Sequence, residues 1–260
     1  MRVTVLGKSP SWQDVDGACS GYLVQQDDTR VLLDCGSGVF AKLRRALDYR
    51  TLDAVVLSHL HADHFLDLVP FSYALQYGPP PEGTSEPPRA VLHGPRGARE
   101  TFRRVVGAWG GEDLIERSFD IREYDAGDAF EIGALRVATH RVDHFVPTCA
   151  VAFTARDGGP RFVFGADTGP TELLVDAARD AEVLMVEATL PEPDGEDGEA
   201  RGHLTAAEAG EHAKRANVRR LVLTHYSDQL DEEWLREQAE QAFGGPVTAA
   251  REGDVYEIGE

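Results

Sequence analysis

The sequence predicts an α/β (α+β) protein with a four-layer αββα order, in which two sheets pack face to face between outer helices. Apolar, strand-like runs alternate with helix-forming segments along the chain, and no repeat of solenoid period is present. The 260 residues, 42% of them hydrophobic, are enough to bury a substantial core as one unit. We therefore expect a single domain that spans residues 1–260.

In the N-terminal half, strands are expected where Val and Leu gather in short apolar runs, and helices over the longer segments between them. The expected strands are Val3–Leu6, Gly21–Gln25, Val31–Asp34, Ala54–Leu57, Ala90–His93 and Phe119–Glu123, and the expected helices are Val39–Leu47, Phe65–Tyr77 and Arg96–Trp109. The segment 78–88 is rich in proline, which blocks both helix and ladder hydrogen bonds, so it is expected to be irregular.

The C-terminal half begins with short strands and continues as a regular alternation of helix and strand. The expected elements are strands Ala129–Glu131, Leu135–His140, Cys149–Thr154 and Phe162–Phe164, helix Glu172–Ala178, strand Val183–Glu187, helix Ala206–Ala216, strand Arg220–Leu223 and helix Glu232–Phe243. Thr205 and Glu208 form a capping-box pattern at one helix start. The acidic segment 191–200 and the segment 78–88 either rim a substrate cleft or are solvated connectors.

The composition is acidic, with a formal net charge of −19. Such a surface repels a polyanion and disfavours a large nucleic-acid substrate, although acidity also serves solubility. Three scattered cysteines without a Cys-x-x-Cys spacing argue against a disulfide framework or a cysteine zinc site. No apolar stretch approaches a membrane span and no signal-peptide pattern is present, so we expect a cytoplasmic protein without a membrane partner.

The densest group of potential metal ligands follows the apolar run Leu52–Leu57. The next residues read Ser-His-Leu-His-Ala-Asp-His and supply His59, His61, Asp63 and His64. Neutral imidazoles and carboxylates are ligands that zinc accepts, and the end of a strand is a place where such side chains converge. The alternative is a surface loop that happens to be rich in histidine.

Three further candidate ligands lie far along the chain. Asp167 and His225 each follow another strand-like apolar run, and His144 lies shortly before the first of these. A carboxylate between two cations can bridge them, and this role is assigned to Asp167. Two metals about 3.5–4 Å apart would hold a hydrolytic water and a substrate oxygen together.

These motifs resemble the metallo-β-lactamase superfamily. The similarity rests on His-x-His-x-Asp-His at 59–64, the later His144, Gly-Ala-Asp-Thr at 165–168 and Thr-His at 224–225, and it runs from about residue 3 to 258. Lactamase-type and glyoxalase-type members have Thr-Pro-Gly-His-Thr around the later histidine, whereas this chain has His-Phe-Val-Pro-Thr-Cys. Together with Glu-Ala-Thr at 187–189 and His-Leu-Thr at 203–205, this pattern resembles the ribonuclease Z branch of phosphodiesterases.

The resemblance implies the αββα metallo-β-lactamase sandwich and a set of residue roles. One metal ion, expected to be zinc with manganese or iron as alternatives, would be bound by His59, His61 and His144.

The second ion would be bound by Asp63, His64 and His225, with Asp167 between the two. Asp63 would also orient the attacking hydroxide.

Glu187 and His203 match the branch's Glu–His pair, which assists the departing oxygen. Histidine suits this role because its proton is available near neutral pH. The alternative is that His203 is an ordinary loop histidine.

Departures from ribonuclease Z narrow the expected substrate. The branch's Asp-Cys-Gly-Glu-Gly-Thr-Gln motif reads Asp-Cys-Gly-Ser-Gly-Val-Phe at 34–40, and only 22 residues separate His144 from Asp167, where ribonuclease Z inserts a basic arm that grips tRNA. Segments 3–7, 20–23 and 34–38 resemble a group of bacterial relatives, and those relatives in turn resemble atypical class II cyclic-nucleotide phosphodiesterases. We therefore expect a small phosphodiester substrate such as cyclic AMP, with nucleic acid disfavoured and a homodimer implied by resemblance.

Three alternatives stay open: a ribonuclease Z-type tRNA 3′-processing endonuclease, a carboxylic ester, lactone or thioester hydrolase, and a metal-bound protein without turnover. Among the other residues, Asp34 either holds a ligand imidazole or stabilises a turn. His93, His140 and His212 are not assigned as ligands, and His212 is expected to face solvent. Aromatic candidates for contact with a substrate base or sugar are Trp12, Phe145 and Tyr226.

Overall fold

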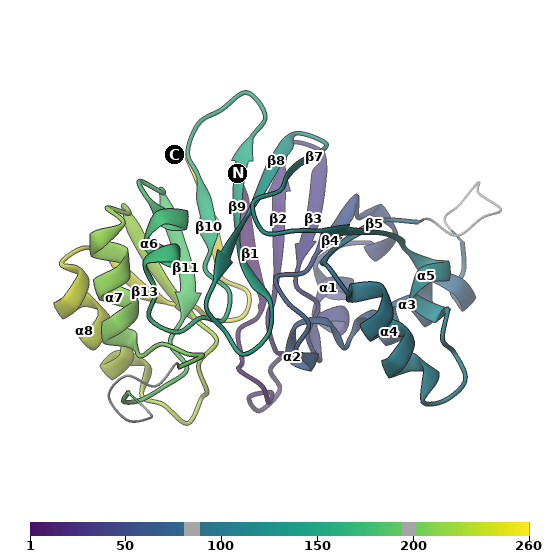
Figure 1. Ribbon diagram of the computed structural model, residues 1–260, viewed down its shortest axis with the longest axis horizontal. Coiled ribbons are helices and arrows are strands. Elements are labelled where there is room, and N and C mark those ends of the chain that lie inside the picture. Colours follow the sequence, from purple (N-terminus) through teal and green to yellow (C-terminus); the bar gives the residue numbers. More distant parts are fainter. Residues whose placement is uncertain (81–88, 194–200, 260) are drawn as a thin grey trace.

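A computed structural model describes residues 1–80, 89–193 and 201–259. Within these ranges the strands form two seven-stranded sheets, which lie in the middle of the molecule with helices on both outer faces (Figure 1). The predicted αββα fold class is confirmed.

The first sheet has the strand order β14-β1-β2-β3-β4-β5-β6. Its strands are β1 (Arg2–Gly7), β2 (Gly21–Gln26), β3 (Thr29–Leu33), β4 (Ala54–Val56), β5 (Val91–Pro95), β6 (Asp120–Tyr124) and β14 (Val255–Glu257). The helices on its side of the molecule are α1 (Val39–Ala46), α2 (Ala62–Phe65), α3 (Leu68–Tyr77), α4 (Ala98–Gly107) and α5 (Leu114–Ser118), with a short 3₁₀ turn at Tyr49–Thr51 (Figure 1).

The second sheet has the order β13-β12-β11-β10-β9-β8-β7. Its strands are β7 (Ala129–Ile132), β8 (Leu135–Val142), β9 (Thr148–Ala155), β10 (Phe162–Phe164), β11 (Val183–Glu187), β12 (Arg220–Thr224) and β13 (Val247–Ala249). Its outer face is covered by α6 (Glu172–Ala178), α7 (Ala206–Arg215) and α8 (Glu232–Phe243), which lie together at the left of Figure 1.

Each sheet is mixed. Strands β3 to β6 are parallel in the first sheet, and strands β10 to β13 are parallel in the second. Parallel strands bring their carboxyl ends to one edge, where the following loops can present functional side chains. The candidate site is built from residues that follow β3, β4, β8, β10 and β12, together with Glu187, the last residue of β11, and His203, which precedes α7.

The apolar core is divided into three layers, as expected for four stacked layers of secondary structure. The alternation of side chains along β3 shows the principle: Val31 and Leu33 belong to the cluster between the two sheets, whereas Leu32 belongs to the cluster under the helices of the first sheet. The sheets also meet directly, because the rings of Tyr22 and Phe164 lie 4.9 Å apart. This shared core fixes the two strand edges against each other.

Most expected elements are present, with three differences. The helix expected at Phe65–Tyr77 is two helices, α2 and α3, and Pro70 fits the first turn of α3 because an N–H is not needed there. Strands β13 and β14 and helix α5 were not predicted. The expectation that His212 faces solvent is wrong: it is 4% exposed, and its Nε2 accepts a hydrogen bond from the Thr171 N–H at 3.1 Å.

No helix among the described residues is long and apolar enough to cross a membrane. The two alternatives for the segments 78–88 and 191–200, a rim of the site or a solvated connector, concern mainly residues 81–88 and 194–200, which lie outside the described ranges.

Candidate metal centre

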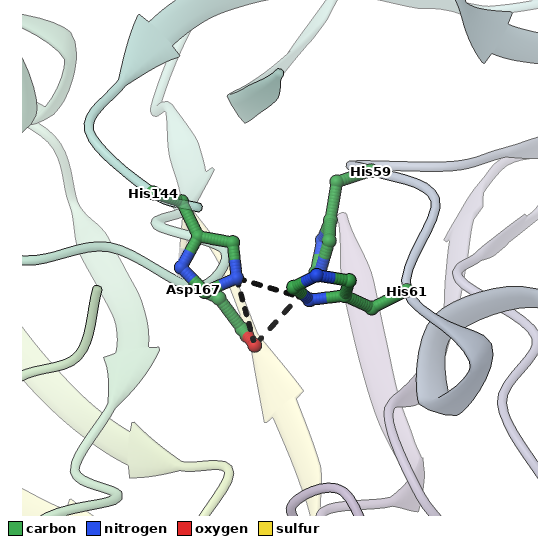
Figure 2. Close-up of side chains that lie close together, drawn as sticks. All are labelled: His59, His61, His144 and Asp167. Atoms are coloured by element: carbon green, nitrogen blue, oxygen red, sulfur yellow. Dashed lines mark hydrogen bonds and ion pairs between the residues drawn. The ribbon is translucent and has the colours of Figure 1, made fainter. Parts of the chain in front are cut away.

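The candidate ligands come from both halves of the chain. His59 and His61 lie between β4 and α2, and Asp63 and His64 lie within α2. From the second half, the β8–β9 connection supplies His144, and the loops after β10 and β12 supply Asp167 and His225. In Figure 2, His59 and His61 approach from one side and His144 from the other, with Asp167 below them.

The first group of side chains consists of His59, His61, His144 and Asp167, with one ligand atom of each within 4.8 Å of the others. His61 Nδ1 and His144 Nε2 are 3.1 Å apart. Asp167 Oδ2 lies 3.8 Å from His59 Nε2 and 4.0 Å from His144 Nε2. Three imidazole nitrogens and a carboxylate oxygen thus face one point, the donor set that a borderline divalent cation accepts.

The second group consists of Asp63, His64, Asp167 and His225 and satisfies the same 4.8 Å limit. His225 Nε2 lies 3.2 Å from Asp63 Oδ2 and 3.4 Å from Asp167 Oδ2, and His64 Nε2 lies 3.4 Å from Asp167 Oδ1. Asp167 belongs to both groups. A single carboxylate could therefore contribute ligand atoms to both groups.

Unsatisfied polar atoms show that the cluster fits metal ions. Among the described residues, six buried side-chain polar atoms have no hydrogen-bond partner, and three of them are His59 Nε2, His64 Nε2 and Asp167 Oδ1. A buried polar atom without a partner is costly, and native structures contain few of them. Cations at the two groups would give all three atoms a partner. The cluster is therefore able to bind metal ions.

Asp34, the residue after β3, orients one of the ligands. Its Oδ1 accepts a hydrogen bond from the Ser58 N–H at 2.7 Å, and its Oδ2 lies 2.8 Å from Ser58 Oγ and 2.7 Å from His64 Nδ1. This carboxylate therefore holds the Nδ1 side of the imidazole and leaves Nε2 for the centre. Of the two alternatives for Asp34, the structure shows the contact with a ligand imidazole.

Three other ligands are held by groups that the sequence analysis did not assign. Ser58 Oγ lies 3.1 Å from His59 Nδ1, and Thr189 Oγ1 lies 2.9 Å from His225 Nδ1. The carbonyl oxygen of Gly202 accepts a hydrogen bond from His144 Nδ1 at 2.7 Å. Serine or threonine beside a histidine motif is a weak sequence signal, and a carbonyl oxygen leaves none.

The backbone is left-handed at three positions around the cluster. Asp34 and Ala166 have φ of 55°, and His225 has φ of 51°. Non-glycine residues seldom adopt this conformation, and Ala166 has no polar side chain that could stabilise it locally. Such conformations persist where the surrounding structure fixes them, which is common at functional sites. Here the left-handed residues lie where the chain leaves β3, β10 and β12 and enters the cluster.

The local environment keeps the three histidines of the first group neutral. Burial lowers the pKa of His59 well below its ordinary value, and neighbouring histidines lower it further. Burial also lowers the pKa of His61, and it lowers that of His144 to about 4. Burial opposes ionisation of Asp167, but the charges of His225 and His64 outweigh it and hold the Asp167 pKa well below its usual range. Neutral imidazoles with an ionised carboxylate are the forms that bind metal.

A histidine–glutamate pair lies beside the cluster. His203 Nδ1 is 2.9 and 3.1 Å from the two carboxylate oxygens of Glu187. Glu187 is 1% exposed, and it also accepts hydrogen bonds from the N–H groups of Thr168 (2.7 Å) and Leu204 (3.2 Å). The hydrogen bond from Thr168, the residue after Asp167, thus fixes the position of the Glu187 carboxylate.

The charge of this pair favours a protonated imidazole. Burial lowers the pKa of His203, but the hydrogen bond and charge of Glu187 outweigh it and raise the pKa to about 9. The His203 ring centroid lies 5.0 Å from that of His144 and 6.0 Å from that of His225. The two residues that the sequence singled out are therefore adjacent to both ligand groups.

The three aromatic candidates for substrate contact differ in position. Tyr226 is 2% exposed and its hydroxyl donates a hydrogen bond to the Ala250 carbonyl at 2.7 Å, so the prediction that Tyr226 contacts a substrate is wrong. Trp12 is exposed. Phe145 is exposed as well and lies beside both His144 and His203.

Comparisons with known proteins identify the family. Residues 29–226 match the beta-lactamase superfamily domain. An uncharacterised protein of Mycobacterium leprae is 36% identical over 99% of this chain and 89% of its own length. The probable metallo-hydrolase YhfI of Bacillus subtilis is 31% identical over 99% of this chain and 100% of the YhfI sequence. A crystal structure of YhfI superposes on this chain with a TM-score of 0.85 and 28% sequence identity, and the match covers 98% of each chain.

Ribonuclease Z of Myxococcus xanthus is 29% identical over 99% of this chain and 98% of its own length. These relatives and the ligand geometry agree with the resemblance seen in the motifs. The chain therefore belongs to the beta-lactamase superfamily, in its ribonuclease Z-like branch, and is a metal-dependent hydrolase.

Proposed function

We propose that the protein is a phosphodiesterase that hydrolyses a small phosphodiester, with a 3′,5′-cyclic nucleotide such as cyclic AMP as its leading substrate. The observation that carries the proposal is the combination of two ligand groups that share Asp167 with a Glu187-bound His203 beside them. The ligand groups suit a site for phosphoryl oxygens, and the pair suits a leaving oxygen that needs a proton.

Each ligand group would hold one divalent cation, zinc in our proposal, with manganese or iron as alternatives that the same ligands accept. His59, His61 and His144 would hold one ion, Asp63, His64 and His225 the other, and Asp167 both. When bound, two such ions polarise a phosphoryl oxygen and make a water molecule nucleophilic near neutral pH.

His203 is the proposed general acid. Its Nδ1 is occupied by Glu187, and its Nε2 has no hydrogen-bond partner among the residues that the structure describes. Because the pKa is raised to about 9, the ring carries a proton at neutral pH that it can give to a departing sugar oxygen. Asp63, whose pKa is held low by its hydrogen bonds to His225 and His64 although burial opposes this, stays ionised and would orient the attacking water.

Several observations favour a small substrate over tRNA. The connection between β9 and β10 is short, so the described chain between His144 and Asp167 holds two strands and a turn rather than a basic arm. The alignment with ribonuclease Z of Myxococcus xanthus extends over 308 positions, whereas this chain has 260 residues, so that relative carries segments that this chain lacks. A net charge of −19 also opposes the approach of a polyanion.

The relatives named ribonuclease Z support tRNA 3′-end processing as the second candidate. A lactone or thioester hydrolase of the same fold is a third, but such substrates make less use of a protonated His203 beside the ligands. A cytoplasmic location and a homodimer stay predictions from the sequence.

The test is a comparison of substrates with zinc- or manganese-loaded protein. Cyclic AMP, bis-p-nitrophenyl phosphate, a precursor tRNA and a thioester are assayed side by side, and Asp167→Asn is compared with His140→Gln. His140 is a half-buried histidine of β8 outside both ligand groups, which makes it a matched control. Hydrolysis of cyclic AMP that is lost on chelation and in Asp167→Asn supports the proposal. Inert cyclic AMP with 3′ cleavage of tRNA, or with faster thioester hydrolysis, overturns it.

A further inference from the structure

We propose that Phe145 is a specificity residue: its exposed ring forms a platform on which a planar aromatic group of the substrate, such as a nucleobase, stacks. The inference rests on the proposed function for the location of the scissile phosphate. It adds a requirement on the rest of the substrate, which the ligand cluster does not determine.

The first observation is the exposure of Phe145 at the edge of the candidate metal centre. The side chain is 68% exposed although the two residues after β8, Asp143 and His144, are tied to other segments. The Phe145 ring centroid lies 5.1 Å from that of His144 and 6.0 Å from that of His203. A large apolar ring is thus exposed to solvent next to a proposed metal ligand, His144, and the proposed general acid, His203.

The second observation is that the ring is held in place from one side. A Cβ atom on Gly202 would lie 2.3 Å from Cε2 of the Phe145 ring, so the ring packs on backbone that only glycine leaves open. The same glycine accepts the hydrogen bond from His144 Nδ1 through its carbonyl oxygen. A ring that is supported on one side and exposed on the other loses little rotational freedom when a planar group stacks on it.

The third observation is a cavity of about 580 Å³ on this side of the site. His144 and Phe145 line it, together with residues that include Tyr124, Arg96 and Arg141. Arg96 is paired with Asp125, whereas Arg141 has no ion-pair partner among the described residues. The lining also includes Asp125 and Asp143, so Arg141 is the cationic side chain left for an anion. The volume falls within the range of pockets that hold small ligands, and the exposed Phe145 ring together with Arg141 can contact a planar group and an anionic group of one small molecule.

Binding measurements test the platform without relying on turnover. The metal-loaded protein is titrated with AMP and with ribose 5-phosphate, which differ by the base, in the wild type and in Phe145→Ala, Phe145→Leu and Phe145→Trp. Trp109→Ala serves as the matched control because Trp109 is another exposed aromatic residue, 53% exposed, that does not line the cavity. Circular dichroism and the melting temperature verify that each variant is folded.

We expect the wild type to bind AMP more tightly than ribose 5-phosphate. Phe145→Ala should weaken AMP binding by about 5- to 150-fold, the range for stacking of one base on an aromatic side chain, while ribose 5-phosphate binding stays within about twofold. Phe145→Trp should retain the preference for AMP, and Phe145→Leu should lose most of it because leucine is apolar but not planar. Trp109→Ala should bind both ligands like the wild type.

Two results would overturn the inference: equal affinity of the wild type for the two ligands, or an equal loss for both in Phe145→Ala. These outcomes are separate from failure of the proposed function. A protein that binds AMP through Phe145 but hydrolyses no phosphodiester retains the platform and refutes the activity. A protein that hydrolyses cyclic AMP with the same KM in Phe145→Ala as in the wild type retains the activity and refutes the platform.

Discussion

Replacing His203 by alanine should reduce turnover of cyclic AMP strongly without loss of metal. His203 is bonded to Glu187 through Nδ1 and belongs to neither of the two ligand groups that contain Asp167. A lost general acid reduces the rate by about 10²–10⁴-fold, which corresponds to about 2.7–5.5 kcal/mol in activation free energy. Glu187 remains hydrogen-bonded to the Thr168 and Leu204 N–H groups, so the neighbouring Asp167 should keep its position.

The size of the loss should depend on the leaving group. A sugar oxygen leaves as a poor anion and needs the proton, whereas p-nitrophenolate is a stable anion and leaves without one. We therefore expect His203→Ala to lose at least about tenfold more activity toward cyclic AMP than toward bis-p-nitrophenyl phosphate. This difference separates a lost acid from general damage to the site.

The assay measures kcat for both substrates and the metal content by elemental analysis, in His203→Ala and in the control His140→Gln. Equal losses toward both substrates would refute the role as an acid. Loss of bound metal in His203→Ala would show instead that His203 is a ligand. Glu187, His203 and His225 also lie close enough together to form a third group of potential ligands.

Three further predictions concern the groups around the ligands. Glu187→Gln removes the charge that raises the pKa of His203 to about 9, so the basic limb of the pH–rate profile, where activity falls as His203 loses its proton, should move down toward the ordinary value of about 6.5. Cations bound at Asp63 and Asp167 would cancel the part of the raised pKa that these two carboxylates contribute, so we expect the wild-type limb below pH 9. A limb that does not move in Glu187→Gln would contradict the assignment. Asp34→Asn should weaken metal affinity by about 10- to 100-fold, because an amide cannot replace the acceptor contacts of the carboxylate to both Ser58 and His64. The affinity is measured by competition with a chelator, and Asp120→Asn, at an exposed position, is the control. Equal metal affinity of the two variants would contradict the role of Asp34. Zinc at about 1,000 times its Kd should stabilise the wild type by about 4 kcal/mol, or about 8–16 °C in melting temperature. Asp167→Asn should lose more than half of this shift because both ligand groups share that residue. A shift in Asp167→Asn as large as that of the wild type would exclude a shared ligand.

The sequence predicted the positions of the candidate ligands because each of them follows an apolar run or a recognisable motif. Asp167 and His225 each follow a buried strand closely, which placed them at strand ends, whereas their grouping with the other histidines came from the family resemblance. The proximity of Glu187 and His203 came from the family resemblance. The structure brings them within hydrogen-bond distance, but no spacing in the sequence required it.

What the sequence did not predict depends on contacts between distant segments. Strands β13 and β14 have three residues each, too few for an alternating pattern, and they are defined by pairing with β12 and β1. The buried position of His212 depends on Thr171, which precedes α6, and helical periodicity does not reveal such a partner. The same holds for the Gly202 carbonyl oxygen, which orients His144 through a backbone atom.

Whether two ions share Asp167 can be tested by a crystal structure of the zinc-loaded protein, with anomalous scattering measured on both sides of the zinc absorption edge. We expect two anomalous peaks, one among His59, His61, His144 and Asp167 and the other among Asp63, His64, Asp167 and His225. A single peak, or a peak coordinated by His203 in place of one of these ligands, would contradict a centre in which Asp167 is shared by two ions and His203 is left free to donate a proton.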